Sequence, residues 1–173
     1  MFTLIFKGLV RPHLEYAAPV WSPHLIKYKD ILENVQRRAT KMVPGLSEKS
    51  YPERLKHLKL PTLTYRRTRG DMIQVYKLMN GGYDKALPPL LTKSDTGLRG
   101  HSKKLYHKGF NKDIRKYCFD IRICELWNSL PENLAKAKDV RSFEKGLDSH
   151  WQNQEQMFLD YKADIKIRNP VSY

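Results

Sequence analysis

The chain of 173 residues carries 32 Lys and Arg side chains against 18 Asp and Glu, which gives a formal net charge of +14. A hydrophobic content of 40% can fill a core and excludes wholesale disorder, and no apolar run reaches the roughly 20 residues that span a bilayer. Two cysteines cannot form a disulfide framework. We therefore expect a soluble, basic, intracellular protein of the cytoplasm or nucleus, with no membrane partner.

Helical periodicity dominates the first part of the chain. Apolar residues from Ile31 to Val43 fall on one side of a predicted helix that ends at Pro44. The other side of this helix is expected to carry Gln36, Arg37, Arg38 and Lys41. Ser50 and Glu53 have the spacing of a capping box, which predicts a short helix that ends before Pro61.

The second part alternates predicted helices with loops. Thr62 is placed to cap a longer helix that Gly81 and Gly82 close. A basic loop that contains several glycines follows, and helical spacing returns between Ile114 and Trp127. Asp139 is placed to cap a last helix with one apolar side, which carries Val140, Phe143, Leu147 and Trp151.

These patterns predict an all-α fold of several amphipathic helices, with a basic loop or a small β-hairpin near 97–112. The expected organisation is a helical region 1–87, a basic loop 88–112, a second helical region 113–151 and a weakly structured tail 152–173. Three large aromatic side chains are expected to anchor the core: Trp21, Trp127 and Trp151.

Catalytic motifs are missing from the sequence. It contains no glycine-rich phosphate loop, no HExxH and no GxSxG. Nucleotidyl transfer needs clustered carboxylates that hold two cations, and no Asp-Asp pair occurs anywhere. A zinc site made of His101, His107, Cys118 and Cys124 is disfavoured by its ligand spacing. We expect no enzyme activity from this chain, no cofactor, no metal and no small-molecule substrate.

Positive charge is concentrated before residue 123. Residues 1–122 hold 25 basic and 10 acidic side chains, whereas 123–173 hold 7 and 8. Such an excess attracts polyanions, although a solvated basic surface that keeps a protein soluble is the plainer explanation. The candidate nucleic-acid contacts are Arg37, Arg38, Lys41, Arg66, Arg67, Arg69, Arg99, Lys103, Lys104 and Lys108.

Two groups within that set carry distinct arguments. Arg66, Arg67 and Arg69 lie within four positions, and their sequence neighbourhood offers no acids to pair with them, which favours a bound polyanion. Tyr106 and Phe110 lie among the loop cations, where exposed aromatics would stack on single-stranded bases. The alternative, which we favour, packs these two rings into the core of a hairpin.

An ordered set of segments resembles the thumb and carboxyl-terminal region of non-LTR retrotransposon reverse transcriptases of the LINE type. The set covers roughly residues 10 to 151 and consists of VRPHLEYAAPVWSP at 10–23, LENVQRRATK at 32–41, YPERL at 51–55, LPTLTYRRTRGD at 60–71, YK at 76–77, RGH at 99–101, RICELWNSLP at 122–131 and FEKGLDSHW at 143–151.

The resemblance implies the ancestry of an RNA-directed DNA polymerase from a transposable element. In that family a palm with two catalytic aspartates precedes the thumb, and no residue of this chain corresponds to them. The implied role is to grip the phosphates of an RNA or DNA template–primer duplex, beside the palm and fingers of a reverse transcriptase. We expect a truncated element copy, or a gene model that begins at an internal Met.

Two other classes of function stay open. The first is a helical protein-interaction module that docks on the acidic surface of a partner, and the second is a relic of a retroelement without function. Salt dependence separates the first of these from phosphate binding, because a hydrophobic docking surface responds much less to salt.

Overall fold

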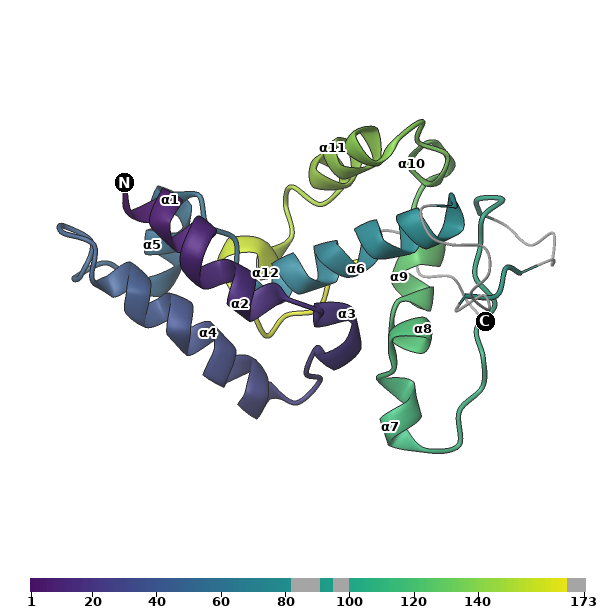
Figure 1. Ribbon diagram of the computed structural model, residues 1–173, viewed down its shortest axis with the longest axis horizontal. Coiled ribbons are helices and arrows are strands. Elements are labelled where there is room, and N and C mark those ends of the chain that lie inside the picture. Colours follow the sequence, from purple (N-terminus) through teal and green to yellow (C-terminus); the bar gives the residue numbers. More distant parts are fainter. Residues whose placement is uncertain (82–90, 95–99, 168–173) are drawn as a thin grey trace. The chain divides into compact units, whose positions relative to one another are not determined.

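The computed structural model describes residues 1–81, 91–94 and 100–167, which are mainly helical. Figure 1 shows the described chain as helices joined by loops. Within these ranges β-structure is limited to one antiparallel bridge, between Lys93 and Leu105. The expected all-α fold is therefore confirmed. None of the described helices combines the length and the apolar character that crossing a membrane requires.

The chain divides into two compact units, and each contains residues distant in sequence. Unit 1 consists of Met1–Thr68 and Asn153–Ile165, and unit 2 is built on Arg69–Gln152. The division falls inside helix α6 (Leu63–Met79), which is continuous. This organisation differs from the expected one, because part of the predicted tail forms a helix and belongs to unit 1.

Unit 1 is built from short and medium helices around a small apolar cluster. Its helices besides α6 are α1 (Phe2–Ile5), the π-helix η1 (Phe6–Val10), α2 (Arg11–Glu15), α3 (Ala18–Trp21), α4 (Ile26–Lys41), α5 (Tyr51–Leu58) and α12 (Glu155–Phe158). Phe6, Leu55 and Leu60 form the centre of the cluster, against which Phe2, Val10, Ala39, Tyr51, Leu58 and Phe158 pack. Trp21 stays 39% exposed, so the prediction that it anchors the core is wrong.

Local caps fix the ends of α5 and α6. Ser50 and Glu53 form the predicted capping box, in which the Ser50 backbone N–H donates to the Glu53 carboxylate over 2.8 Å. Thr62 caps α6, since its hydroxyl oxygen accepts the backbone N–H of Tyr65 at 3.1 Å. The Thr62 hydroxyl also donates to the backbone carbonyl of Gln156, which ties α12 to the start of α6. Both predicted helix starts are confirmed.

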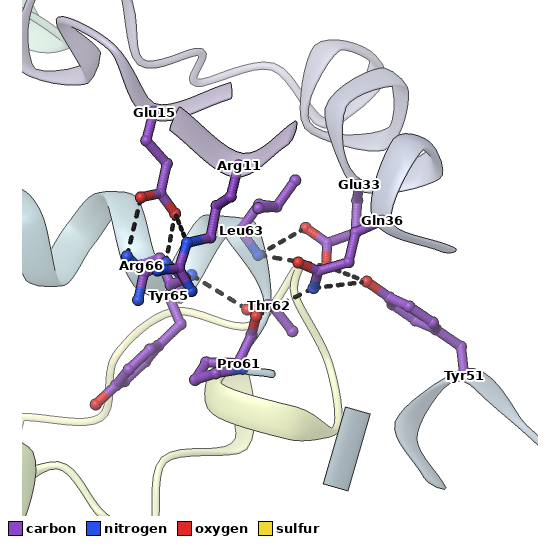
Figure 2. A network of polar contacts seen from close by, with 10 residues as sticks. All are labelled: Arg11, Glu15, Glu33, Gln36, Tyr51, Pro61, Thr62, Leu63, Tyr65 and Arg66. Atoms are coloured by element: carbon purple, nitrogen blue, oxygen red, sulfur yellow. Dashed lines mark hydrogen bonds and ion pairs between the residues drawn. The ribbon is translucent and has the colours of Figure 1, made fainter. Parts of the chain in front are cut away.

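Helix α4 buries a different side from the predicted one. Its buried side chains are polar (Glu33, Gln36 and Thr40), whereas Ile31, Val35 and Met42 of the predicted core row are exposed. The reason is a polar network that holds one side of the helix against the start of α6 (Figure 2). Three residues of the predicted apolar row therefore face solvent, whereas Leu32, Ala39 and Val43 are half-buried, and Ala39 packs against the cluster of unit 1.

That network centres on the buried carboxylate of Glu33. It accepts the Tyr51 hydroxyl at 2.6 Å and the backbone N–H of Leu63 at 3.0 Å. The Gln36 amide donates to the Tyr51 oxygen and to the Pro61 carbonyl. Burial raises the pKa of Glu33 by more than these hydrogen bonds lower it, and burial likewise raises the pKa of Tyr51.

Unit 2 packs its core around the second part of α6. Its remaining helices are α7 (Asp113–Lys116), α8 (Phe119–Arg122), α9 (Cys124–Asn128), α10 (Glu132–Ala135) and α11 (Val140–His150). The predicted helical stretch from Ile114 to Trp127 is thus three short helices. Trp127 and Trp151 are buried as predicted, and the ring of Phe143 stacks on Tyr76 at a centroid distance of 4.5 Å. Asp139 caps α11 as predicted, by accepting the backbone N–H of Ser142.

Candidate nucleic-acid interface

The three candidate cations of α4 do not act as one set. The Arg37 guanidinium is half-buried, donates to the Asn34 side chain and lies over the rings of Tyr51 and Tyr161. Arg38 and Lys41 are exposed. The expectation that all three face solvent together, opposite a buried apolar row, is therefore wrong.

The three arginines of α6 have protein partners that the sequence neighbourhood does not reveal. Arg66 forms a two-pronged ion pair with Glu15, seen in Figure 2. Partial burial, together with the nearby Arg66 charge, lowers the pKa of Arg11. Arg69 pairs in the same two-pronged way with Asp148. Arg67 is buried and donates to the Thr64 hydroxyl. The prediction that these charges need a bound polyanion is wrong, since carboxylates on helices distant in sequence pair with Arg66 and Arg69.

The loop candidates divide between anchored and accessible side chains. Arg99 lies outside the described residues. Lys103 is half-buried and donates to the Asn80 side chain, and Lys104 is buried. Lys108 keeps 40% of its side chain exposed, with its ammonium 3.8 Å from the Asp120 carboxylate. Of the three described cations, Lys108 is thus the best placed to reach a ligand.

Side chains of α9 clamp the backbone of the loop before these accessible residues. The Asn128 amide bonds both the N–H and the carbonyl of Leu105, at 2.8 and 2.9 Å, as a neighbouring strand would. The buried indole of Trp127 donates to the carbonyl of Lys103 over 2.7 Å. His101 contacts the Trp127 carbonyl, and burial lowers the pKa of His101, which favours its neutral form. Asn128 therefore fixes the loop at Leu105.

The clamp leaves two aromatic side chains outside the core. Tyr106 is 56% exposed and Phe110 is 37% exposed. The Tyr106 backbone N–H donates to Thr92, beside the bridge that pairs Leu105 with Lys93. The chain then continues without regular structure to α7 (Figure 1). Our preferred expectation, that these rings form the core of a hairpin, is wrong.

Exposed cations follow these aromatic rings along the chain. Lys112 and Lys116 are exposed at the two ends of α7, while Arg115 is bound to Asp120 at 2.5 Å. We call residues 106–116 the aromatic–basic segment. Neither Lys112 nor Lys116 was among the candidate contacts, although both belong to the basic stretch before residue 123, because charge counts do not separate paired from accessible side chains.

The cysteines and histidines do not assemble into a metal site within residues 1–81, 91–94 and 100–167. Cys124 is buried in α9, and burial raises the pKa of its thiol to about 11. Its thiol points at the Tyr106 carbonyl. A thiol with so high a pKa is a poor nucleophile at neutral pH, so Cys124 acts as core filler.

No family model matches the chain, and neither a curated protein nor a solved structure matches it. The resemblance to reverse transcriptase thumbs therefore stays a prediction from the sequence.

Replacing Gly100 by alanine should destabilise unit 2 and loosen the clamped loop. Gly100 has φ +117°, a region that residues with a Cβ rarely adopt, and an added Cβ would lie 2.4 Å from Cε of buried Lys104. We expect a loss of about 1 to 3 kcal/mol in the free energy of unfolding, measured by urea denaturation with tryptophan fluorescence. Gly109→Ala is the matched control, because a Cβ there meets nothing within 4 Å. Equal stability of the two variants would contradict the argument.

Proposed function

We propose that the chain binds RNA or DNA through the aromatic–basic segment, and that it makes this contact as the thumb-like part of a reverse transcriptase without a catalytic site of its own. The observation that carries the proposal is the exposure of Tyr106 and Phe110 in a segment that also presents Lys108, Lys112 and Lys116. Exposed aromatic rings that gather beside charged side chains are typical of interaction surfaces, and we infer such a use for these two. Stacking on unpaired bases, with lysines on the phosphates, supplies that use.

The anchoring of the segment supports this reading. The backbone at Leu105 is fixed on both sides by the Asn128 amide, so the Tyr106 ring starts from a rigid point. A fixed start lowers the entropy lost when a ligand orders the segment. Stacking is tolerant of sequence because every base has a π-face, so we expect affinity with little sequence preference.

The template–primer role is the more specific part of the proposal, and it rests on the sequence resemblance. Phosphate contacts fix position and carry no sequence information, which suits a polymerase thumb. The proposal includes no catalytic step, because residues 1–173 contain no Asp-Asp pair. The cations Arg66, Arg67 and Arg69 are not part of it, since their protein contacts already engage them.

The test is fluorescence anisotropy of the full chain with a labelled single-stranded RNA and with an RNA–DNA primer–template, from about 50 to 300 mM salt. Three lysines that each neutralise one phosphate predict that log K falls with log salt at a slope of about −2 on the single strand. Replacing Lys112 and Lys116 by glutamine should bring the slope to about −1 or shallower.

The control for this experiment is the pair Lys138→Gln and Lys145→Gln, two exposed lysines of unit 2 outside the segment. Their replacement should leave the slope unchanged. A helical, cooperatively melting chain that shows no affinity for either ligand at low salt would refute the proposal. A slope that falls equally in both pairs of variants would refute the assignment to the aromatic–basic segment.

A further inference from the structure

Helix α4 and its C-cap residue Met42 present a continuous, mostly apolar row of side chains to solvent. Tyr28, Ile31, Val35 and Met42 are 50, 55, 38 and 81% exposed, and Arg38 lies exposed between the last two. We call these five residues the α4 row. They follow one another at steps of three, four, three and four residues, which is the spacing of the a and d positions in a coiled coil. In this heptad numbering the a positions are Tyr28, Val35 and Met42, and the d positions are Ile31 and Arg38.

The orientation of the row is set by the opposite side of the helix. Glu33 and Thr40 lie seven residues apart at the f position of the same heptads, and both are fully buried. The Glu33 carboxylate bonds Tyr51 and Leu63, and the Thr40 oxygen accepts from the Arg54 guanidinium. Because these polar contacts hold α4 by its f side, the a and d positions are directed outward.

The charges beside the row are positive. Lys27 and Lys41 occupy g positions and are exposed, and Arg38 stands within the row at a d position. The acidic side chains of α4 lie elsewhere on the helix: Glu33 is buried, and Asp30 accepts the hydroxyl of Tyr161. A helix that packs on this row therefore contacts apolar side chains bordered by cations. Its binding is favoured if it carries carboxylates opposite those cations.

A second copy of the chain fits the row poorly. In an antiparallel pair the g positions face each other, which sets Lys27 against Lys41 of the other copy. In a parallel pair the d positions meet, which places the two Arg38 guanidinium groups together inside the seam. Both arrangements bring like charges into contact without a carboxylate between them, and such juxtapositions select against self-pairing.

We propose that the α4 row is a docking site for an amphipathic helix of another protein, one with apolar residues at its a and d positions and with Glu or Asp along its flanks and opposite Arg38. The row spans fifteen positions of the chain, a length of about 21 Å. A partner helix covers it with about two heptads. The docking site lies in unit 1, whereas the aromatic–basic segment lies in unit 2.

The probe for this proposal is a synthetic helix of about four heptads with Ile at a, Leu at d and Glu at every e and g position. Its matched counterpart has Lys in place of every Glu. Isothermal titration of the full chain with each peptide should show binding of the acidic one and at least about tenfold weaker binding of the basic one. Replacing Ile31 and Val35 by Asp should abolish the binding.

Two sets of variants keep the test decisive. Leu159→Asp, an exposed apolar residue of unit 1 outside the row, is the control for added charge and should bind the acidic peptide as the parent does. Replacing both Lys27 and Lys41 by Glu should invert the preference, so that the basic peptide binds more tightly. These sites are exposed, and circular dichroism would verify that each variant is folded.

Each other outcome overturns the proposal. Equal affinity for both peptides, or an unchanged preference after charge reversal, would rule out an acidic helix as the partner. If neither peptide binds to the folded chain, the α4 row is not a docking site. Sedimentation as a dimer that the Asp substitutions at Ile31 and Val35 dissociate would assign the row to a second copy. Replacement of Tyr106 and Phe110 by alanine should leave peptide binding unchanged, which separates this site from the nucleic-acid proposal.

Discussion

Replacing both Tyr106 and Phe110 by alanine should weaken the binding of single-stranded RNA by about 2 to 3 kcal/mol, roughly 30- to 150-fold in Kd. The two rings are exposed, so their removal takes away stacking surfaces without opening a cavity in the core. The Tyr106 backbone keeps its bond to Thr92, and the segment therefore keeps its anchor. Fluorescence anisotropy at fixed salt measures the change.

Two further variants define what such a loss would mean. Tyr16→Ala removes a ring that is more accessible than either of these, since Tyr16 of unit 1 is 82% exposed, and it should leave RNA affinity unaltered. Tyr106→Trp offers a larger stacking surface and should retain the affinity. If the double alanine variant binds as tightly as the parent, the segment does not stack on bases, and its lysines alone would have to account for any binding.

Replacing Glu33 by alanine should destabilise unit 1 by about 3 kcal/mol, because the partly buried hydroxyl of Tyr51 and the buried backbone N–H of Leu63 both lose their acceptor. The expected consequence is faster hydrogen exchange at the Leu63 amide and a lower midpoint in urea. Glu48→Ala removes an exposed carboxylate from the same unit and should stay within about 0.5 kcal/mol of the parent. Equal effects of the two replacements would contradict the network.

The same carboxylate makes stability depend on pH with a defined sign. Burial raises the pKa of Glu33 in the folded state above its value in the unfolded chain, so the folded state binds the proton more tightly. The contribution of Glu33 to stability therefore increases as pH falls through the folded pKa, and it levels off below the unfolded pKa. Glu33→Gln should remove this dependence, so the stabilities of parent and variant should diverge between neutral pH and about 4.5. Parallel curves would contradict the raised pKa.

Helix ends were predictable from sequence because their causes are local. The capping box at Ser50, the cap at Thr62 and the cap at Asp139 each use side chains within three residues of the groups they satisfy. Proline and glycine positions act over the same range, through the backbone conformations they forbid or permit. For such features the pattern in a short window contains the whole interaction.

Which side of α4 is buried could not be predicted in this way. Apolar periodicity alone assigns Ile31 and Val35 to a core, yet the partners that decide the orientation are Tyr51 and Leu63, up to 30 residues further on. A buried carboxylate that serves as an acceptor for another helix leaves no periodic signal. The nucleic-acid candidates were affected similarly: the acids that pair with Arg66 and Arg69 lie 51 and 79 residues away. The anchor at Leu105, next to Tyr106, likewise comes from Asn128, which lies 23 residues further on.

Unit 1 is closed by residues from both ends of the described chain, and this imposes an order on how it forms during synthesis. The Thr62 hydroxyl reaches the Gln156 carbonyl across 94 residues, and Ile165 is buried in the same unit. The ribosome has therefore released all of Arg69–Gln152 before the last piece of unit 1 becomes available. Unit 2 can fold first, and its folding brings the two parts of unit 1 together, which shortens the loop that unit 1 must close.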